Sequence, residues 1–476
     1  MIGKREAEFV SLLFKMKDME KNTIAAIASG IASSGIGIIR ISGDDAVKTA
    51  EKVVRVKGGN NTALEDRRAV LCTVFDGEEV IDEAIVLVMK GPHSYTGEDV
   101  AEIQCHGGPY VMKRVLDAVI HAGARNAQPG EFTKRAFLNG RIDLSQAEAV
   151  MDLIKADSEF ARKAAVSQLK GALKEKVTKI RQKLIYETAY LEAALDDPEH
   201  ISLEGYRERL LKTVSEASAE IEKLIETSEN GRVLKEGIKT AILGRPNAGK
   251  STLLNLLLGQ ERAIVTKIPG TTRDTLEESA RLGDITLRLV DTAGIRQARD
   301  EVEKIGVKKS VETAKMAALI LFVIDGGEEF TAEDEKTYND IKNITKQTGA
   351  PIITLINKID KNRTAPCGGD FENVIMISAK TGEGKDLLEE KIKDLFYHEK
   401  IKSSQEQIIA GARQKEELSR AAAALKNVRE AIENNMPEDL FTVDLMDAYD
   451  SLGRITGETA DEDLINQIFE SFCMGK

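Results

Sequence analysis

The residues with the clearest chemistry lie near the middle of the chain, where positions 244–251 read Gly-Arg-Pro-Asn-Ala-Gly-Lys-Ser. This complete G-x-x-x-x-G-K-S phosphate loop follows a β-prone run at 239–243 and precedes the apolar-periodic start of a helix at 251–258. In such a loop, backbone N–H groups bind the phosphates, Lys250 contacts the β and γ oxygens, and Ser251 holds Mg²⁺. The sequence therefore predicts nucleotide hydrolysis, with phosphate contacts from Asn247, Ala248, Gly249, Lys250, Ser251 and Thr252.

Three further motifs follow strand-like runs and select guanine over adenine. Asp291 can reach the Mg²⁺ shell, and the Gly294 N–H can sense the γ-phosphate. Asp360 would accept hydrogen bonds from N1–H and the 2-amino group of guanine, and the Ala379 N–H would donate to O6. Adenine lacks both donors, and leaving a buried carboxylate unpaired costs about 1–3 kcal/mol. The predicted contacts are Asp291, Thr292, Ala293, Gly294, Asn357, Lys358, Asp360, Ser378, Ala379 and Lys380.

The residue after Asp291-Thr-Ala-Gly294 is Ile295, where small signalling GTPases carry the glutamine that orients the attacking water. An aliphatic side chain cannot orient water, and no arginine finger is evident in the sequence. Two candidates could replace the glutamine. Asn247 and the segment 266–274 could surround a monovalent cation beside the phosphates with oxygen ligands. The acidic stretch Asp300-Glu-Val-Glu303 could instead supply a carboxylate that orients water.

Motifs beyond the phosphate loop give a resemblance to a known family. Downstream of the loop these motifs are Gly270-Thr-Thr-Arg-Asp274, Asp291-Thr-Ala-Gly-Ile-Arg296, Asp300-Glu-Val-Glu-Lys-Ile-Gly306 and Phe472-Cys-Met-Gly-Lys476. Nearer the N-terminus they are Ser94-Tyr-Thr-Gly-Glu-Asp99, His106-Gly-Gly108, Pro129-Gly-Glu-Phe132 and Arg135-Ala-Phe-Leu-Asn-Gly-Arg-Ile-Asp-Leu144. With these motifs the chain resembles the TrmE/Era-like family of tRNA-modifying GTPases over nearly everything after about residue 19.

For the nucleotide site, the resemblance implies a K⁺-dependent GTP hydrolase that forms a homodimer and cycles between GTP and GDP. The K⁺ ligands would be Asn247 and the carbonyl oxygens of Thr266, Ile268 and Thr271. Thr272 would join Ser251 at Mg²⁺, and Glu303 would be the catalytic residue that orients water, as a base or by position alone. Thr266, Thr271 and Thr272 are also expected to contact GTP.

The resemblance also implies a site for a reduced folate, 5-formyl- or 5,10-methylene-tetrahydrofolate. Its residues would be Arg40, Glu102, Arg141 and Lys476. A carboxylate such as Glu102 can accept two hydrogen bonds from a pterin edge, and guanidinium groups suit the carbonyls and the glutamate tail. One family feature is missing, because Gly30-Ile-Ala-Ser-Ser-Gly35 replaces the usual Pro-Pro-Gly-Arg-Gly loop.

The implied reaction takes place on tRNA. Family members act with the FAD-dependent protein MnmG (GidA), as a heterotetramer, to add an aminomethyl-type (carboxymethylaminomethyl) group to C5 of the wobble uridine. The folate gives the one-carbon unit, and glycine or ammonium gives the nitrogen. Cys473 is a further catalytic candidate because C5 chemistry on uridine can use a thiolate, although no histidine or helix start near it is evident to lower its pKa.

A second class of function stays open, a ribosome- or RNA-associated assembly GTPase whose front domain is not catalytic. The net charge of −12, from 79 acidic and 67 basic residues, is a poor electrostatic match for tRNA. Local basic stretches at 134–141 and 162–183, or a dedicated tRNA-binding partner, would resolve this conflict.

Composition predicts a modular protein of a reducing, cytoplasmic compartment. A chain of 476 residues exceeds the usual size of one core, so we expect two or three domains. Cysteines 72, 105, 367 and 473 form no C-x-x-C pair, which argues against a disulfide framework or structural zinc. No apolar stretch approaches the roughly 20 residues that span a bilayer. Residues 1–18 lack a secretory cleavage site, and Met19 is a candidate start.

The elements that position these residues indicate a multidomain α/β and α protein. Strand-like runs at 36–41, 70–75 and 84–89 with a helix at 110–122 predict an α+β domain. A helical hairpin follows over 144–229, and helices return at 405–434 and after it. The first long helix would bury an apolar face of Leu173, Val177, Ile180, Leu184, Leu191 and Leu195, and the last helix would open on the capping box Thr459-Ala-Asp-Glu462.

The GTPase is expected to be a Ras-like P-loop domain, with a doubly wound and mostly parallel sheet, inserted between two halves of a helical domain. The expected segments are an N-terminal extension (1–18), an α+β tetrahydrofolate-binding and dimerisation domain (19–137), the first half of the helical domain (138–235), the GTPase domain (236–395) and the second half of the helical domain (396–476).

Overall fold

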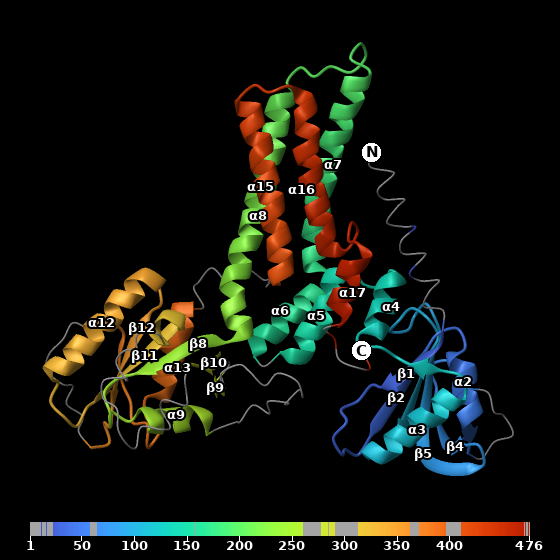
Figure 1. Ribbon diagram of the computed structural model, residues 1–476, viewed down its shortest axis with the longest axis horizontal. Helices are drawn as coiled ribbons and strands as arrows, with labels where there is room; N and C mark the ends of the chain where they lie inside the picture. Colours follow the sequence, from blue (N-terminus) through green and yellow to red (C-terminus); the bar gives the residue numbers. More distant parts are fainter. Residues whose placement is uncertain are drawn as a thin grey trace. The chain divides into compact units, whose positions relative to one another are not determined.

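The structure is a computed structural model that divides into two compact units (Figure 1). Unit 1 comprises Met1–Ile154, Gln168–Ile225 and Ala412–Lys476, and unit 2 comprises Lys155–Ser167 and Glu226–Gly411. The domain boundaries given above stay a prediction. The structure describes residues 11, 16, 22–57, 64–156, 158–259, 278–283, 285–290, 313–361, 371–396, 411–470, 472 and 475, without the side chains of 229–236 and 333.

Unit 1 contains a mixed sheet in the order β3-β4-β5-β6-β2-β1-β7. Two helices, α2 and α3, pack on one face and bury Ile39, Val86 and Ile103. The predicted strand at 36–41 begins one residue later because Ile36 is exposed. The elements are β1 Ile24–Ile27, β2 Gly37–Ser42, α2 Ala46–Val53, β3 Val54–Val56, β4 Ala69–Asp76, β5 Glu79–Met89, β6 Val100–Cys105, α3 Pro109–His121 and β7 Arg125–Asn126.

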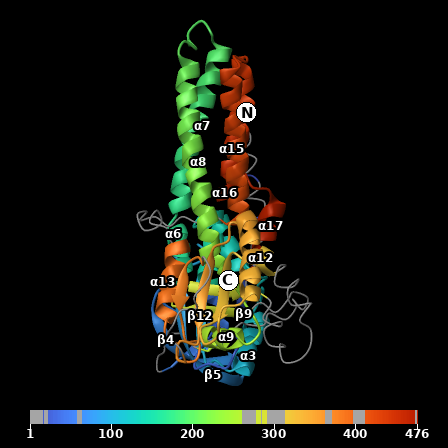
Figure 2. The ribbon, with the colours of Figure 1, turned by 90° about the vertical axis from the view of Figure 1, so that its left-hand side faces the viewer.

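The remainder of unit 1 is helical. The long helices α7, α8, α15 and α16 lie side by side in both views (Figures 1 and 2). The predicted apolar face of α7 is buried from Leu173 to Leu191, but Leu195 is exposed because it lies at the last turn, beyond the packed region. The elements are α4 Glu131–Leu138, α5 Leu144–Lys155, α7 Ala172–Asp196, α8 Tyr206–Glu236, α15 Ala412–Glu433, η1 Glu438–Leu440, α16 Phe441–Thr456 and α17 Glu462–Glu470. Helix α6, Glu159–Leu169, belongs mostly to unit 2, as does the end of α8 from Glu226.

The predicted cap of the last helix is wrong. The N-terminus of α17 is capped by Asp461, whose carboxylate accepts a hydrogen bond from the Leu464 N–H at 2.8 Å. Thr459 lies too early for this role, and its hydroxyl donates to the carbonyl oxygen of Asp450 at 2.8 Å. Aspartate is at least as good an N-cap as threonine, so capping preference alone does not distinguish Asp461 from Thr459. The tertiary contacts of this segment place Asp461 at the N-cap position.

Unit 2 is a doubly wound sheet in the order β13-β12-β11-β8-β10-β9. All neighbouring pairs are parallel except β10 with β9. Helices α9 and α13 bury apolar side chains on one face, and α12 buries Tyr338 and Ile341 on the other. The elements are β8 Ile238–Leu243, α9 Lys250–Leu258, β9 Glu278–Leu282, β10 Ile285–Leu289, β11 Leu319–Asp325, α12 Ala332–Thr348, β12 Ile352–Asn357, β13 Val374–Met376 and α13 Lys385–Phe396.

The predicted fold class is confirmed, because an α+β region, a helical region and a doubly wound P-loop sheet are all present. Strand β11 explains why the sheet is covered on both sides: its continuous apolar run sends alternate residues into two different cores. Among the described residues, no helix has the length and apolar character needed to cross a membrane.

Candidate functional site

The phosphate loop joins the end of β8 to the start of α9, and close contacts require glycine at both of its glycine positions. Gly244 has φ 142°, and a Cβ there would lie 2.2 Å from the carbonyl oxygen of Val323. Gly249 has φ 96°, and a Cβ there would lie 2.1 Å from Nδ2 of Asn357. A side chain at either position would strike neighbouring protein atoms, so the loop can follow this path only with glycine there. The phosphate contacts themselves stay a prediction.

Lys250 opens helix α9 and reaches back over the loop. Its ammonium donates to the carbonyl oxygens of Gly244 and Arg245, both at 2.6 Å. Burial lowers the pKa of Lys250 to about 8, because removing an ammonium from water disfavours its charge. Ser251 and Thr252 follow in the first turn and are exposed.

The guanine-selecting motifs brace the phosphate loop from the ends of β11 and β12. Asn357 donates through Nδ2 to the carbonyl oxygen of Ala248 at 2.9 Å. Lys358 donates to the carbonyl oxygen of Asn247 at 2.8 Å and pairs with Asp325 at 2.5 Å. The structure thus brings the residues of the first and third motifs into one network.

The Asp360 and Ser378 side chains meet at the edge of this network. Ser378 donates to Oδ1 of Asp360 at 2.8 Å, and this hydrogen bond lowers the pKa of the Asp360 carboxyl. The exposed carboxylate is therefore charged at neutral pH, as an acceptor for guanine requires. The Ala379 N–H, expected to donate to O6 of guanine, donates instead to Oδ1 of Asn357 at 2.9 Å. In this conformation it connects the 378–380 segment to β12.

Several predicted residues of this site lie outside the described residues, and their predicted roles stay predictions. They are Thr266, Ile268, Thr271, Thr272, Asp291, Thr292, Ala293, Gly294 and Glu303. Cys473 and Lys476 also lie outside the described residues.

A second group of predicted residues meets on the sheet face of unit 1 that α2 and α3 leave free. Arg40 of β2 lies directly opposite Glu102 of β6, and its Nε donates to Oε1 of Glu102 at 2.8 Å. These side chains are 14% and 13% exposed. The guanidinium carbons of Arg40 and Arg141 each lie 5.2 Å from the centroid of the Tyr95 ring. The paired charges and the ring offer both hydrogen bonds and a stacking surface to a flat heterocycle.

Gly475, near the C-terminal end of the chain, lies beside Arg40 in this group. Arg40 donates to the carbonyl oxygen of Gly475 at 3.4 Å. Gly475 is packed closely against β1, since a Cβ there would lie 2.2 Å from the carbonyl oxygen of Ile27. The structure thus joins Arg40, Glu102 and Arg141 and places the neighbour of Lys476 beside them.

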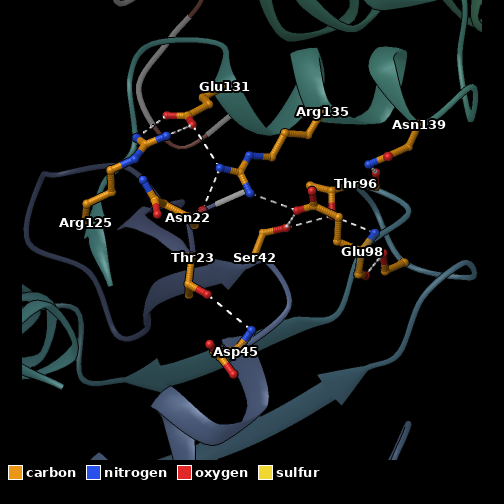
Figure 3. Close-up of polar contacts among 11 residues, drawn as sticks. Asn22, Thr23, Ser42, Asp45, Thr96, Glu98, Arg125, Glu131, Arg135 and Asn139 are labelled. Carbon is orange, nitrogen blue, oxygen red and sulfur yellow. Dashed lines mark hydrogen bonds and ion pairs between the residues drawn. The ribbon is translucent and has the colours of Figure 1, made fainter. Parts of the chain in front are cut away.

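A buried polar network supports the loop that carries Tyr95 (Figure 3). Arg135 of α4 is 2% exposed and donates to Glu98 at 3.0 Å and to Glu131 at 3.2 Å. Burial opposes the ionisation of Glu131, but Arg125, the Gln128 N–H and Arg135 together lower its pKa. Of the three cations in the predicted basic stretch at 134–141, Arg135 is therefore excluded, because it neutralises buried carboxylates and cannot face a partner.

A phosphate loop braced by an Asn-Lys-x-Asp motif on a doubly wound sheet defines a GTP-binding P-loop protein. Residues 144–473 match the model of the MnmE helical domain, and residues 23–141 match that of the GTP-binding protein TrmE N-terminus. A tRNA modification GTPase MnmE from Lachnoclostridium phytofermentans is 49% identical, over 96% of this chain and 100% of the relative. Another from Clostridioides difficile is 43% identical, over 96% and 99%. The chain therefore belongs to the MnmE family of tRNA modification GTPases.

Solved structures give a weaker likeness. The G domain of the T. maritima FeoB iron transporter is 23% identical, with a TM-score of 0.23 over 34% of this chain and 99% of that one. The assignment of unit 2 rests on its own strand order and phosphate loop.

Sequence reasoning missed Tyr95 and Phe132. The Arg40 guanidinium carbon lies 5.7 Å from the Phe132 ring centroid, and the Tyr95 hydroxyl is 2.9 Å from Oγ1 of Thr133. Both aromatic residues lie within motifs that carry the family resemblance, Ser94-Tyr-Thr-Gly-Glu-Asp99 and Pro129-Gly-Glu-Phe132. Aromatic residues in short motifs otherwise rich in glycine and small polar residues were the available signal.

Proposed function

We propose that this chain hydrolyses GTP at the phosphate loop and, with the FAD-dependent MnmG (GidA), adds a carboxymethylaminomethyl-type group to C5 of the wobble uridine of cytoplasmic tRNA. The observation that carries the proposal is the Arg40, Glu102 and Arg141 cluster around Tyr95, in the same chain as a GTP site. A GTPase with a non-catalytic front domain has no need of such a cluster.

The first site suits a reduced folate that supplies the one-carbon unit when bound. Glu102 would accept hydrogen bonds from the amino group and ring N–H of the pterin, and the Arg40 bond holds its carboxylate in place. Arg141 and Lys476 would hold carbonyl or carboxylate groups of the same ligand. The Tyr95 ring would stack on the pterin. Cys473 stays a candidate for the attack on uridine.

The second site suits GTP with Mg²⁺ and K⁺. Asn247 has φ 64°, a conformation that asparagine tolerates better than most residues, and its carbonyl is held by Lys358. Its side-chain amide would bind K⁺ together with the carbonyl oxygens of Thr266, Ile268 and Thr271. Ser251 and Thr272 would hold Mg²⁺, and Glu303 would orient the attacking water. These roles replace the glutamine that Ile295 cannot supply.

A homodimer is supported by the exposed face of the unit 1 sheet. Leu71 and Ile85 lie directly opposite each other on β4 and β5 and are 51% and 42% exposed. The same face carries Arg40 and Glu102, because Leu87 pairs with Glu102 across β5 and β6. An exposed apolar surface continuous with a polar site is typical of a protein interface. A second copy of this chain would cover it.

The proposal is tested on the full-length wild type and Glu102→Gln. Each is titrated with 5-formyltetrahydrofolate and assayed for GTP hydrolysis in KCl and in NaCl at equal ionic strength. We expect wild type to bind the folate and to hydrolyse GTP faster in KCl. Glu102→Gln keeps the shape but removes the charge, so it should bind at least tenfold more weakly, a loss of about 1.4 kcal/mol, while its hydrolysis is unchanged.

Two results would count against the proposal. Absence of folate binding by wild type, with normal wobble-uridine modification in a deletion strain, would favour an assembly GTPase. Equal hydrolysis in the two salts, with the same molecular size in both when GDP and aluminium fluoride are present, would exclude the K⁺ role.

A further inference from the structure

The side chain of Arg245 leaves the phosphate loop and reaches the start of helix α12. Its NH1 nitrogen donates to Oδ2 of Asp334 at 2.8 Å and to Oγ1 of Thr331 at 2.9 Å. The Asp334 side chain is 7% exposed and that of Arg245 is 28% exposed. None of the nucleotide motifs includes Asp334, which lies 89 positions further along the chain than Arg245.

Asp334 already has a local task. Thr331 is the N-cap of α12, and its hydroxyl accepts the Asp334 N–H at 3.4 Å. The Asp334 carboxylate accepts the Thr331 N–H at 3.1 Å and the Thr331 hydroxyl at 2.9 Å, which completes a capping box. A capping box does not need an arginine. The bond between Asp334 and Arg245 therefore has a role other than capping helix α12.

The bond to Asp334 fixes the position of Arg245, whose backbone forms part of the phosphate loop. Its carbonyl oxygen, with that of Gly244, accepts the Lys250 ammonium. The second half of the loop has separate anchors, since Lys358 holds the Asn247 carbonyl and Asn357 holds the Ala248 carbonyl. When Lys250 also contacts the phosphates, its three donors are shared between them and these carbonyls. The Arg245 bond to Asp334 does not depend on Lys250.

We propose that Asp334 is a positioning residue for GTP hydrolysis, which holds Arg245 so that the first half of the phosphate loop keeps its shape when the Lys250 donors are shared with the phosphates. This inference rests on the proposed GTP site. A displaced loop would bind the phosphates less well in both the ground state and the transition state, so the effect belongs mainly in the KM for GTP.

The test compares the steady-state kinetics of full-length Arg245→Ala, Asp334→Asn and the double variant in KCl. Each single variant should raise the KM for GTP about tenfold and change kcat less than threefold, and the double variant should be no worse than Arg245→Ala. Arg245→Lys should recover some of the loss, since an ammonium can still pair with Asp334.

Gly349→Ala is the matched control for a merely structural role. Gly349 caps the other end of α12 with φ 73° and has open space around it, so alanine strains the helix without touching the loop. It should lower the thermal midpoint of unfolding and leave the KM unchanged. An unchanged KM in both single variants, or an equal rise in Gly349→Ala, would overturn the inference. A wild type that does not hydrolyse GTP would overturn the proposed function as well.

Discussion

At the scale of single residues, Lys250 carries a charge that the folded protein alone disfavours. Burial lowers its pKa to about 8, whereas phosphate oxygens beside the ammonium would raise it again. Above about pH 8 the free protein has lost this proton and the nucleotide complex still holds it. Binding must then take up a proton, so nucleotide affinity should fall as pH rises from about 8 to 10.

The measurement is calorimetry of GDP binding in buffers of different ionisation enthalpy. Wild type should take up close to one proton at about pH 9 and almost none at pH 7, and affinity should weaken by up to about tenfold per pH unit above the pKa. Lys250→Arg is the matched control, because arginine stays protonated throughout this range. Proton uptake by the arginine variant equal to that of wild type would assign the effect to another group.

Residues that act through their own functional group at a fixed spacing could be predicted from the sequence, as Lys250, Asn357 and Asp360 were. Residues that act by holding another side chain could not. Asp334 and Tyr95 reach their partners only through the fold, across separations that no local pattern encodes. The same limit explains the error at Arg135, whose burial depends on carboxylates brought in by other elements.

At the scale of elements, the start of α4 supports α17 and the chain that follows it. Gly130 has φ 72°, and a Cβ there would lie 2.5 Å from the carbonyl oxygen of Phe469. Phe137 of α4 packs on Phe469 with ring centroids 6.2 Å apart. Five residues after α17 ends, the Gly475 carbonyl meets Arg40. The position of α17 thus helps to shape the candidate folate site.

We therefore expect Gly130→Ala to destabilise unit 1 by about 2–4 kcal/mol, from positive φ and overpacking together, and to weaken 5-formyltetrahydrofolate binding. Denaturant unfolding and a folate titration measure the two effects. Gly77→Ala is the control, since Gly77 also has positive φ but has no neighbour within 4 Å. It should cost about 1 kcal/mol from backbone strain alone and leave folate binding intact. Equal effects of the two substitutions would show that α17 does not depend on this contact.

Element type was predictable because apolar periodicity and turn residues are local, whereas element ends were not. Strand β2 begins at Gly37 and does not include Ile36, and Leu195 at the end of α7 is exposed. Contacts with other elements, which the local sequence does not encode, determine which terminal residues are buried. For the same reason Asp461, and not Thr459, caps α17. The Thr459 hydroxyl donates to the carbonyl oxygen of Asp450 on α16, a contact that the sequence could not reveal.

At the scale of the whole molecule, unit 1 must be assembled from three separate stretches of chain. One polar cluster joins all three. Glu148 of the first stretch pairs through both carboxylate oxygens with Arg413 of the third, at 2.8 and 2.9 Å. Gln414 donates to Glu148, and Gln168 of the second stretch donates to Gln414 at 3.0 Å. The two glutamines are almost completely buried.

Arg413→Ala should therefore weaken unit 1 and spare unit 2. Removing one partner of a mostly buried ion pair leaves the other unsatisfied, at a cost of about 2 kcal/mol, which should lower the midpoint of unit 1 by about 5 °C. Calorimetry with and without saturating GDP distinguishes the units, because GDP raises only the transition of the unit that binds it. The GDP-insensitive transition should move. Arg420→Ala removes a more exposed arginine on the same helix and should move neither transition. A shift of both transitions by Arg413→Ala would mean that the two units unfold together.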